Sequence, residues 1–226
     1  MHSEPDLAAA ATLLAEPARA ELVLAALADG PLSASELAAR AGVSRSTASG
    51  HLRRLVEGRF LVVAAQGRSR RYELAGPEVA EAVEALSRVA PPRVARSLRE
   101  ANRNELIREA RTCYDHLAGR LGVAFAGALE RRGVVERSNG DYVLGRLAAA
   151  ELAELGIELE PLVGLRRPLV RGCLDWSERE LHLAGALGAA LTARLFALGC
   201  IVRRDGTRSV ALTDAGRELF DELGAA

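Results

Sequence analysis

The sequence predicts a mostly α-helical protein with small β-hairpins, organised as two domains. The chain has 226 residues, more than the ~100 to 200 of a typical domain, and 49% of them are hydrophobic, enough for packed cores. Apolar residues recur at helical spacing along most of the chain and change to β-branched runs around glycine turns at a few places. We expect one domain over 1–90 and a second over 91–226, which contains a repeat at about 111–155 and 171–223.

Composition limits the class of protein. Basic and acidic residues balance at 30 each, and no Lys is present. Three Cys, an odd number, are too few for a disulfide framework. The N-terminal apolar run has acidic neighbours and no basic leader, and no apolar segment approaches the ~20 residues of a membrane span. We expect a soluble cytoplasmic protein of a bacterium with reduced thiols and no membrane partner.

Two helices open the first domain. Pro17 suits the first turn of a helix whose apolar residues recur at helical spacing until Asp29 and the glycine after it. Ser33 and Glu36 have the spacing of a capping box, which begins a short second helix that Gly42 ends. The sequence therefore predicts a helix, a connection and a second helix before residue 43.

A third helix follows the glycine turn, and a hairpin follows the helix. Ser44 is a suitable N-cap, and Leu52, Leu55 and Val56 form the expected buried stripe. The next segment, "RFLVVAAQGRSRRYEL", has two strand-like runs around a polar turn with Gly67. This order of elements is that of a winged helix-turn-helix, whose third helix enters the major groove of DNA and whose hairpin, the wing, reaches neighbouring phosphates.

Local charge supports DNA binding although the total charge does not. Segment 31–75 has 8 Arg against 3 Glu, a local charge of +5. The alternative is a solvated Arg-rich face on an adaptor that binds only proteins. The predicted DNA contacts are polar residues of the third helix and its cap, namely Ser44, Arg45, Ser46, Thr47, Ser49, His51, Arg53 and Arg54, together with Arg68, Arg70 and Arg71 of the wing.

Residues 12–75 resemble the ArsR/SmtB family of small dimeric repressors. Three motifs carry the resemblance. They are "EPAR" at the start of the helix that begins with Pro17, "SGHLRRL" in the third helix, which is the recognition helix, and "GRSRRYEL" in the wing. It implies a homodimer on a two-fold symmetric double-stranded operator, released by a signal. Metal-sensing members of the family carry a pair of thiols in the helix before recognition, whereas "SASELAARAG" has no Cys, which excludes that metal site here.

Helices flanking the winged unit are where members of that family dimerise. Leu7–Leu14 and 79–86, within a helix expected over Pro77–Val89, are therefore the candidate dimer stripes. We predict that Leu13, Leu14 and Val83 belong to the interface. The alternative is that both stripes are ordinary core of one chain.

The second domain contains an internal repeat whose copies begin at His116 and His182. The pattern of residues in each copy predicts a helix, a strand, an Asn-Gly or Asp-Gly turn, a second strand and a closing helix. This order is that of a winged-helix-like α+β module. The helix expected over 185–198 is apolar with Arg194 as its only charge, so it is expected to be buried rather than in a groove. Effector sensing is therefore favoured over a second DNA reader.

An Arg-Cys-Asp pattern precedes each copy, and three interpretations remain open. It is Arg111, Cys113 and Asp115 in the first copy and Arg171, Cys173 and Asp175 in the second. The first interpretation is structural, with small core thiols and a buried Arg–Asp pair. The second is a pocket between the copies for a small organic effector, which predicts no metal and no cofactor; its residues would be Arg111, Cys113, Tyr114, His116, Cys173, Trp176 and His182. The third is a thiol-based sensor of a metal ion or oxidant that uses Cys113 and Cys173 with His116 or His182.

Catalysis is not expected. Cys113, Asp115 and His116 are the residue types of a nucleophilic site, but on one helix they cannot form a relay in which His bridges the other two. The sequence has no Gly-rich phosphate loop and no HExxH motif. The favoured function is a homodimeric repressor released by an effector in the second domain; a thiol-based metal or oxidant sensor and a non-DNA-binding adaptor are the alternatives.

Overall fold

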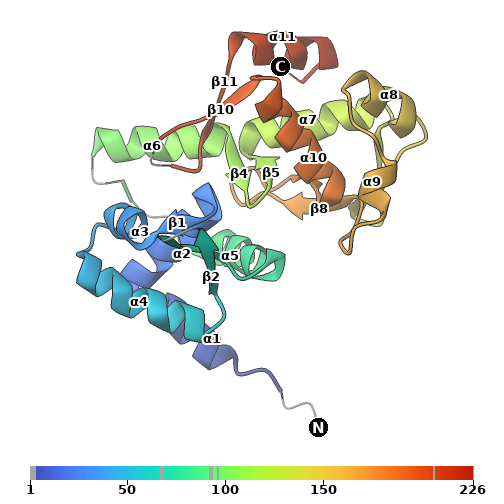
Figure 1. Cartoon of the computed structure of the whole chain (residues 1–226). Coiled ribbons are helices and arrows are strands. Elements are labelled where there is room, and N and C mark those ends of the chain that lie inside the picture. The colour runs from blue at the N-terminus through green and yellow to red at the C-terminus, as the bar shows by residue number, and fades with distance from the viewer. Residues whose placement is uncertain (1–3, 67–68, 92–93, 96, 206, 226) are drawn as a thin grey trace. The chain divides into compact units, whose positions relative to one another are not determined.

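The computed structural model describes residues 4–66, 69–91, 94–95, 97–205 and 207–225 (Figure 1). The chain divides into two compact units, Met1–Glu84 and Ala85–Ala226. The division falls inside α5 (Pro77–Val89), a few residues before the boundary expected at 90. Most of the described residues are helical and the strands form small antiparallel sheets, so the predicted fold class is confirmed.

The first unit has the predicted winged helix-turn-helix order. Its sheet is antiparallel with strand order β1-β3-β2, and β2 and β3 form the wing hairpin. The elements before α5 are α1 (Leu7–Leu14), α2 (Pro17–Asp29), β1 (Leu32–Ser33), α3 (Ala34–Ala41), α4 (Arg45–Glu57), β2 (Leu61–Gln66) and β3 (Ser69–Leu74).

Local capping explains why the helices begin and end where they do. The amide of Ser33 donates to the Glu36 carboxylate at 2.7 Å and the amide of Glu36 donates to the Ser33 hydroxyl at 3.3 Å, so the predicted capping box is present. Gly42 ends α3 at a φ of 66°, a left-handed conformation that glycine adopts without strain. The Ser44 hydroxyl then accepts from the amide of Thr47 at 3.1 Å and begins α4.

The second unit begins with α6 (Leu98–Glu109) and contains the predicted repeat. Each copy has a short hairpin, a long helix, a second hairpin and a closing helix, with α9 (Glu160–Val163) between the copies. The first copy comprises β4 (Arg111–Cys113), β5 (His116–Ala118), α7 (Gly119–Arg131), β6 (Val135–Ser138), β7 (Asp141–Leu144) and α8 (Ala148–Glu154); the second comprises β8 (Arg171–Leu174), β9 (Leu181–Ala184), α10 (Gly185–Ala197), β10 (Ile201–Arg203), β11 (Val210–Leu212) and α11 (Asp214–Leu223).

The two copies interlock in a reciprocal way. Helix α7 of the first copy packs on β9 of the second, and α10 of the second packs on β5 of the first. A Cβ at Gly122 of α7 would lie 2.5 Å from the carbonyl oxygen of Leu117, and a Cβ at Gly188 of α10 would lie 2.5 Å from that of Leu183, so each helix requires glycine where it passes the strand of its own copy. The copies share one hydrophobic core, which the stacked rings of Phe125 and Phe220 help to form.

Two expectations for this unit are wrong in detail. The first residues of each repeat copy, His116 and His182, were expected at the start of a helix, but they lie in β5 and β9. Leu198, expected in the buried stripe of its helix, is the exposed C-cap of α10. Among the described residues, no helix combines the length and apolar character that crossing a membrane requires.

Candidate functional site

Helix α4 of the first unit has a polar face opposite its buried face. Ala48, Leu52 and Leu55 are buried, as expected for an amphipathic helix packed on α2 and α3. The opposite face is exposed and carries Ser46 and Arg53, flanked by Thr47, Ser49 and Arg54, which are also exposed. These five exposed residues are all among the predicted DNA contacts, whereas Glu57 at the end of α4 is exposed and is not one of them.

The start of α4 is ordered by its own side chains. The Ser44 hydroxyl lies 2.9 Å from that of Ser46 and 2.8 Å from that of Thr47. The Nε of Arg45 donates to the hydroxyl of Ser35 in α3 at 2.9 Å, which orients this exposed guanidinium at the turn between the two helices. The cation at the head of α4 is thus held in place before any ligand arrives.

Gly50 lies in the middle of the same exposed face. A Cβ built on it would meet no atom within 4 Å, so no packing within the chain requires glycine there. Interior glycine destabilises a helix by roughly 1 kcal/mol relative to Ala. A bare backbone at this position is useful where another molecule approaches closely.

Two further predicted DNA contacts, His51 and Arg71, also have partners inside the first unit. His51 Nε2 lies 3.6 Å from a carboxylate oxygen of Glu16. Arg71 donates to the carbonyl oxygen of Pro31 at 3.0 Å, which fastens β3 to β1. In the wing, Arg70 is exposed, and Arg68 lies outside the described residues.

The candidate dimer stripes differ in exposure. Helix α1 has no buried residue, and Leu7 is 78% exposed. Leu13, half-buried, packs within its own chain, because a Cβ at Gly58 would lie 2.2 Å from Leu13 Cδ1. Leu14 is half-buried, and Val83 of α5 is buried. Most of the available apolar surface of α1 is therefore at its N-terminal end.

In the second unit, the hairpins before α7 and α10 place a Cys opposite a His. Cys113 pairs with His116 across β4 and β5, and Cys173 pairs with His182 across β8 and β9. Residues directly opposite in antiparallel strands have their side chains on one face of the sheet, with Cβ atoms ~4.5 to 5.5 Å apart. Because β5 and β9 lie in contact, the two pairs meet.

These four residues form what we call the Cys2His2 cluster. One ligand atom from each of Cys113, His116, Cys173 and His182 lies within 4.8 Å of all the others. The two sulfur atoms are 4.0 Å apart and the imidazole centroids 5.1 Å apart. His116 is 5% exposed and His182 is 1% exposed, Cys113 is also buried, and Cys173 is half-buried.

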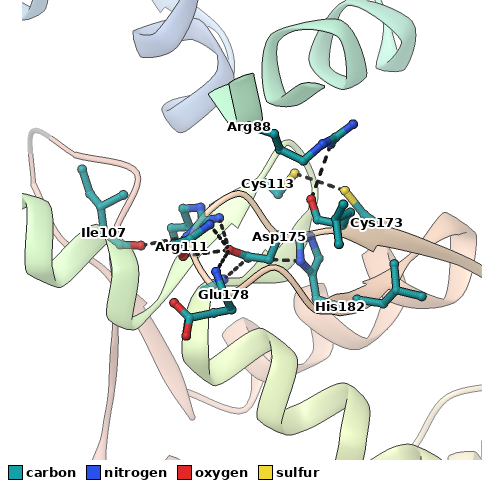
Figure 2. Close-up of polar contacts among 12 residues, drawn as sticks. Arg88, Ile107, Arg111, Cys113, Cys173, Asp175, Glu178 and His182 are labelled. Atoms are coloured by element: carbon teal, nitrogen blue, oxygen red, sulfur yellow. Dashed lines mark hydrogen bonds and ion pairs between the residues drawn. The ribbon is translucent and has the colours of Figure 1, made fainter. Parts of the chain in front are cut away.

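Each imidazole of the cluster has a carboxylate beside it. Asp115 Oδ1 accepts from Nδ1 of His116 at 3.2 Å. Asp175 Oδ2 lies 3.2 Å from Nδ1 of His182 (Figure 2). The Nε2 atoms of both imidazoles are buried and have no hydrogen-bond partner among the described residues. A buried imidazole nitrogen without a partner is destabilising unless something fills the position it faces.

Both carboxylates are compensated by arginine. Asp175, fully buried, accepts from Arg111 at 2.8 Å and from the amide of Gly119 at 2.8 Å (Figure 2). Asp115 accepts from Arg167 at 2.5 Å. The expected buried Arg–Asp pair is present as Arg111–Asp175, and it joins the first copy to the second.

Two groups of the cluster, the Cys173 thiol and the His182 imidazole, have pKa values that their neighbours shift. The neighbouring Cys113 thiol lowers the pKa of the Cys173 thiol, and the nearby imidazoles of His116 and His182 lower it further, against the opposite effect of burial. Burial alone would lower the pKa of His182, but Asp175 and Cys173 raise it. Burial alone would raise the pKa of Asp175, but His182 and Arg111 keep it well below its ordinary range.

Of the seven residues predicted for the effector site, four form the cluster and one supports it through Asp175. Arg111 lies 4.6 Å from the centroid of the Trp176 ring, so both residues sit on the Asp175 side of the cluster. Tyr114 is half-buried in the β4–β5 turn at a φ of 60°. Asp115 and Asp175 were recognised in the repeated pattern, but their place beside the imidazoles and the two hairpins were not predicted. The available signal was the two-residue gap between Cys113 and His116, the length of a tight hairpin turn.

One premise of the argument against catalysis is wrong. Cys113, Asp115 and His116 were placed on one helix, but Cys113 and His116 lie opposite each other on a hairpin and Asp115 touches His116. The hairpin therefore brings together groups that a helix would have kept apart.

Comparisons with known proteins give matches along almost the whole chain. A family model described as a helix-turn-helix domain matches residues 14–64. The chain is 38% identical over 219 residues to the HTH-type transcriptional regulator YdfF of Bacillus subtilis, which covers 96% of each protein.

Among solved structures, similarity covers the first two-fifths of the chain. The homodimeric winged helix-turn-helix domain of Mb0332 from Mycobacterium bovis is 28% identical, covering 39% of this chain and 88% of that one with a TM-score of 0.32. The cadmium sensor CMTR from Mycobacterium tuberculosis is 34% identical, covering 40% and 99% with a TM-score of 0.33.

Proposed function

Because the chain belongs to the family of HTH-type transcriptional regulators, we propose that it is a homodimeric repressor that binds a two-fold symmetric operator and is released by an effector held in its second unit. The predicted winged helix-turn-helix and its resemblance to ArsR/SmtB regulators are confirmed, and the chain is a DNA-binding transcriptional regulator. We propose the remaining parts of this function: the homodimer, the symmetry of the operator, the residues that contact DNA and the release by an effector. Reduced thiols and a chromosomal target agree with a cytoplasmic location.

The polar face of α4 is the observation that supports the proposed DNA contacts. Arg53 and Ser46 lie opposite the buried stripe, and Arg45 is held at the head of the helix by Ser35. Arg and hydroxyl side chains at this position suit base edges and phosphates of the major groove. Arg70 of the wing is exposed and suits a phosphate. His51 and Arg71 have intramolecular partners, and their proposed part is to position α4 and the wing.

A second copy of the chain is the proposed partner of α1. This helix is apolar, has no buried residue and exposes Leu7, which a second α1 would cover. Two recognition helices one DNA turn apart raise the affinity through linked binding. A lone winged unit offers too few contacts for tight specific binding.

The cluster supports one interpretation of the second unit over the others. Its four donor atoms lie within 4.8 Å of one another, which leaves room at their centre for a single ion rather than an organic molecule. This favours the thiol-based metal sensor over the organic effector as the second candidate function. A structural role alone leaves the two partnerless Nε2 atoms unexplained.

DNA retardation separates the repressor from an adaptor. A duplex selected from a random-sequence pool and an unselected duplex should both be bound, with the selected one bound at least roughly a thousandfold more tightly. Arg53→Ala should weaken binding, whereas Arg217→Ala, which removes an exposed arginine of α11, should not. Equal affinity for all duplexes, or no effect of Arg53→Ala, would contradict the proposal.

A further inference from the structure

The geometry of the Cys2His2 cluster matches a tetrahedral metal site. With metal–sulfur bonds of ~2.3 Å and metal–nitrogen bonds of ~2.0 to 2.1 Å, tetrahedral ligands lie roughly 3.3 to 3.8 Å from one another. The two sulfur atoms are 4.0 Å apart, and no pair of ligand atoms exceeds 4.8 Å. Closing on an ion therefore requires movements of about an ångström or less.

The two imidazoles are oriented as metal ligands. Asp115 accepts from Nδ1 of His116, which leaves Nε2 of that ring free to face the cluster, and Asp175 lies 3.2 Å from Nδ1 of His182 on the corresponding side. Both Nε2 atoms are buried and have no hydrogen-bond partner among the described residues. An ion at the centre of the cluster would satisfy both nitrogens at once, which no side chain of the cluster does.

The charges also balance for a divalent ion. Two thiolates, from Cys113 and Cys173, offset the two positive charges of the ion. The nearby carboxylates do not add to this sum, because Asp175 pairs with Arg111 and Asp115 pairs with Arg167. Neutrality matters because an uncompensated charge in the interior is costly.

We propose that Cys113, His116, Cys173 and His182 bind one transition-metal ion per chain, with Zn²⁺ as the ion whose preferences they match. Two sulfur and two nitrogen ligands in a tetrahedron are typical of zinc, and four protein ligands close the site to substrates. Each copy of the repeat supplies one Cys and one His, so the ion joins the two copies. Resting on the sensor function proposed above, this ion is the effector: it changes the affinity of the protein for DNA.

Cobalt(II) alone tests the site. Metal-free, reduced protein should bind one equivalent and develop the absorption bands of thiolate-ligated tetrahedral cobalt, and Zn²⁺ should abolish them. Cys113→Ser, Cys173→Ser, His116→Gln and His182→Gln should each lose stoichiometric binding. Cys200→Ala is the matched control, because Cys200 is buried in the same unit but lies outside the cluster. Bands that persist in the four variants, or no binding by the parent protein, would overturn the site.

Two further measurements keep the proposal testable. Circular dichroism identifies a variant that does not fold. For the parent protein, Zn²⁺ should raise the midpoint of thermal unfolding. A midpoint that stoichiometric Zn²⁺ leaves unchanged would also overturn the site. Retardation of the selected duplex with and without Zn²⁺ should differ by roughly fivefold or more. Stoichiometric metal with unchanged DNA affinity would overturn the effector assignment alone. Absence of DNA binding in both states would instead contradict the proposed function.

Discussion

Replacing Gly50 with Ala should raise the stability of the protein and lower its affinity for DNA. The added methyl group meets no atom within 4 Å, so the folded chain accepts it without strain. Ala is favoured over Gly inside a helix by ~0.8 to 1.0 kcal/mol. For a unit of this size, 1 kcal/mol corresponds to a rise of roughly 4 to 8 °C in the unfolding midpoint.

Gly50→Ala should lower the affinity for DNA although it raises stability, because the added methyl group lies on the exposed face of α4. If this face lies in a groove, an extra methyl at the point of closest approach costs roughly 1 to 3 kcal/mol, which corresponds to a five- to 150-fold weaker complex. Binding of the selected duplex by Gly50→Ala and the parent protein, compared at equal salt concentration, measures this change.

Gly127→Ala is the matched control for this experiment. Gly127 lies inside α7 of the second unit, where an added Cβ would meet only the tip of the Arg131 side chain, at 3.4 Å. This variant should gain stability to a similar extent and keep the affinity of the parent protein. If Gly50→Ala is stabilised and binds the duplex as tightly as the parent, the polar face of α4 does not approach DNA.

Three other predictions concern the contacts described above. Arg45→Ala, like Thr47→Ala, should relax sequence preference by ~1 to 3 kcal/mol per lost base contact, while Arg70→Ala should weaken all duplexes alike and lower the salt dependence, both measured by retardation over a salt series. Leu7→Glu in α1 should shift the protein toward monomer in sedimentation and weaken operator binding. Asp175→Asn, which leaves Arg111 buried without its partner, should cost about 3 to 5 kcal/mol in urea unfolding, whereas Asp214→Asn on the surface should cost little.

Each of these has an outcome that would contradict it. Unchanged discrimination in the Arg45 and Thr47 variants would remove the head of α4 from base readout. A Leu7→Glu protein that stays a dimer would move the interface away from the N-terminal end of α1. An Asp175→Asn protein as stable as the parent would mean that the carboxylate does not hold the two copies together.

The first unit could be predicted from sequence because its determinants are local. Ser33 and Glu36 cap α3 within four residues, and Gly42 and Ser44 define the turn before α4. Motifs of this kind require no knowledge of distant segments. Exposure of α4 also followed from helical periodicity, whereas the partners of Arg71 and His51 did not, because Pro31 and Glu16 are far along the chain.

The second unit was predicted only in outline for the opposite reason. Strands β4 and β5 have three residues each, too short for a period-two pattern to stand out. The cluster then requires that Cys113 meet Cys173, which is a long-range contact made by the packing of two copies. Recognition of the repeat supplied the four residue types, but their convergence depends on the contact of β5 with β9.

Reciprocal packing of the two copies makes the second unit a dimer within one polypeptide. A single copy supplies one Cys and one His to the cluster, so a lone module of this kind would need to self-associate to assemble all four ligands. Fusion removes the dependence on protein concentration that such an assembly would have. It also allows the two copies to diverge. Only the second copy has six extra residues between Asp175 and His182. Asp175 and its partner Arg111 are fully buried, whereas Asp115 and its partner Arg167 are partly exposed.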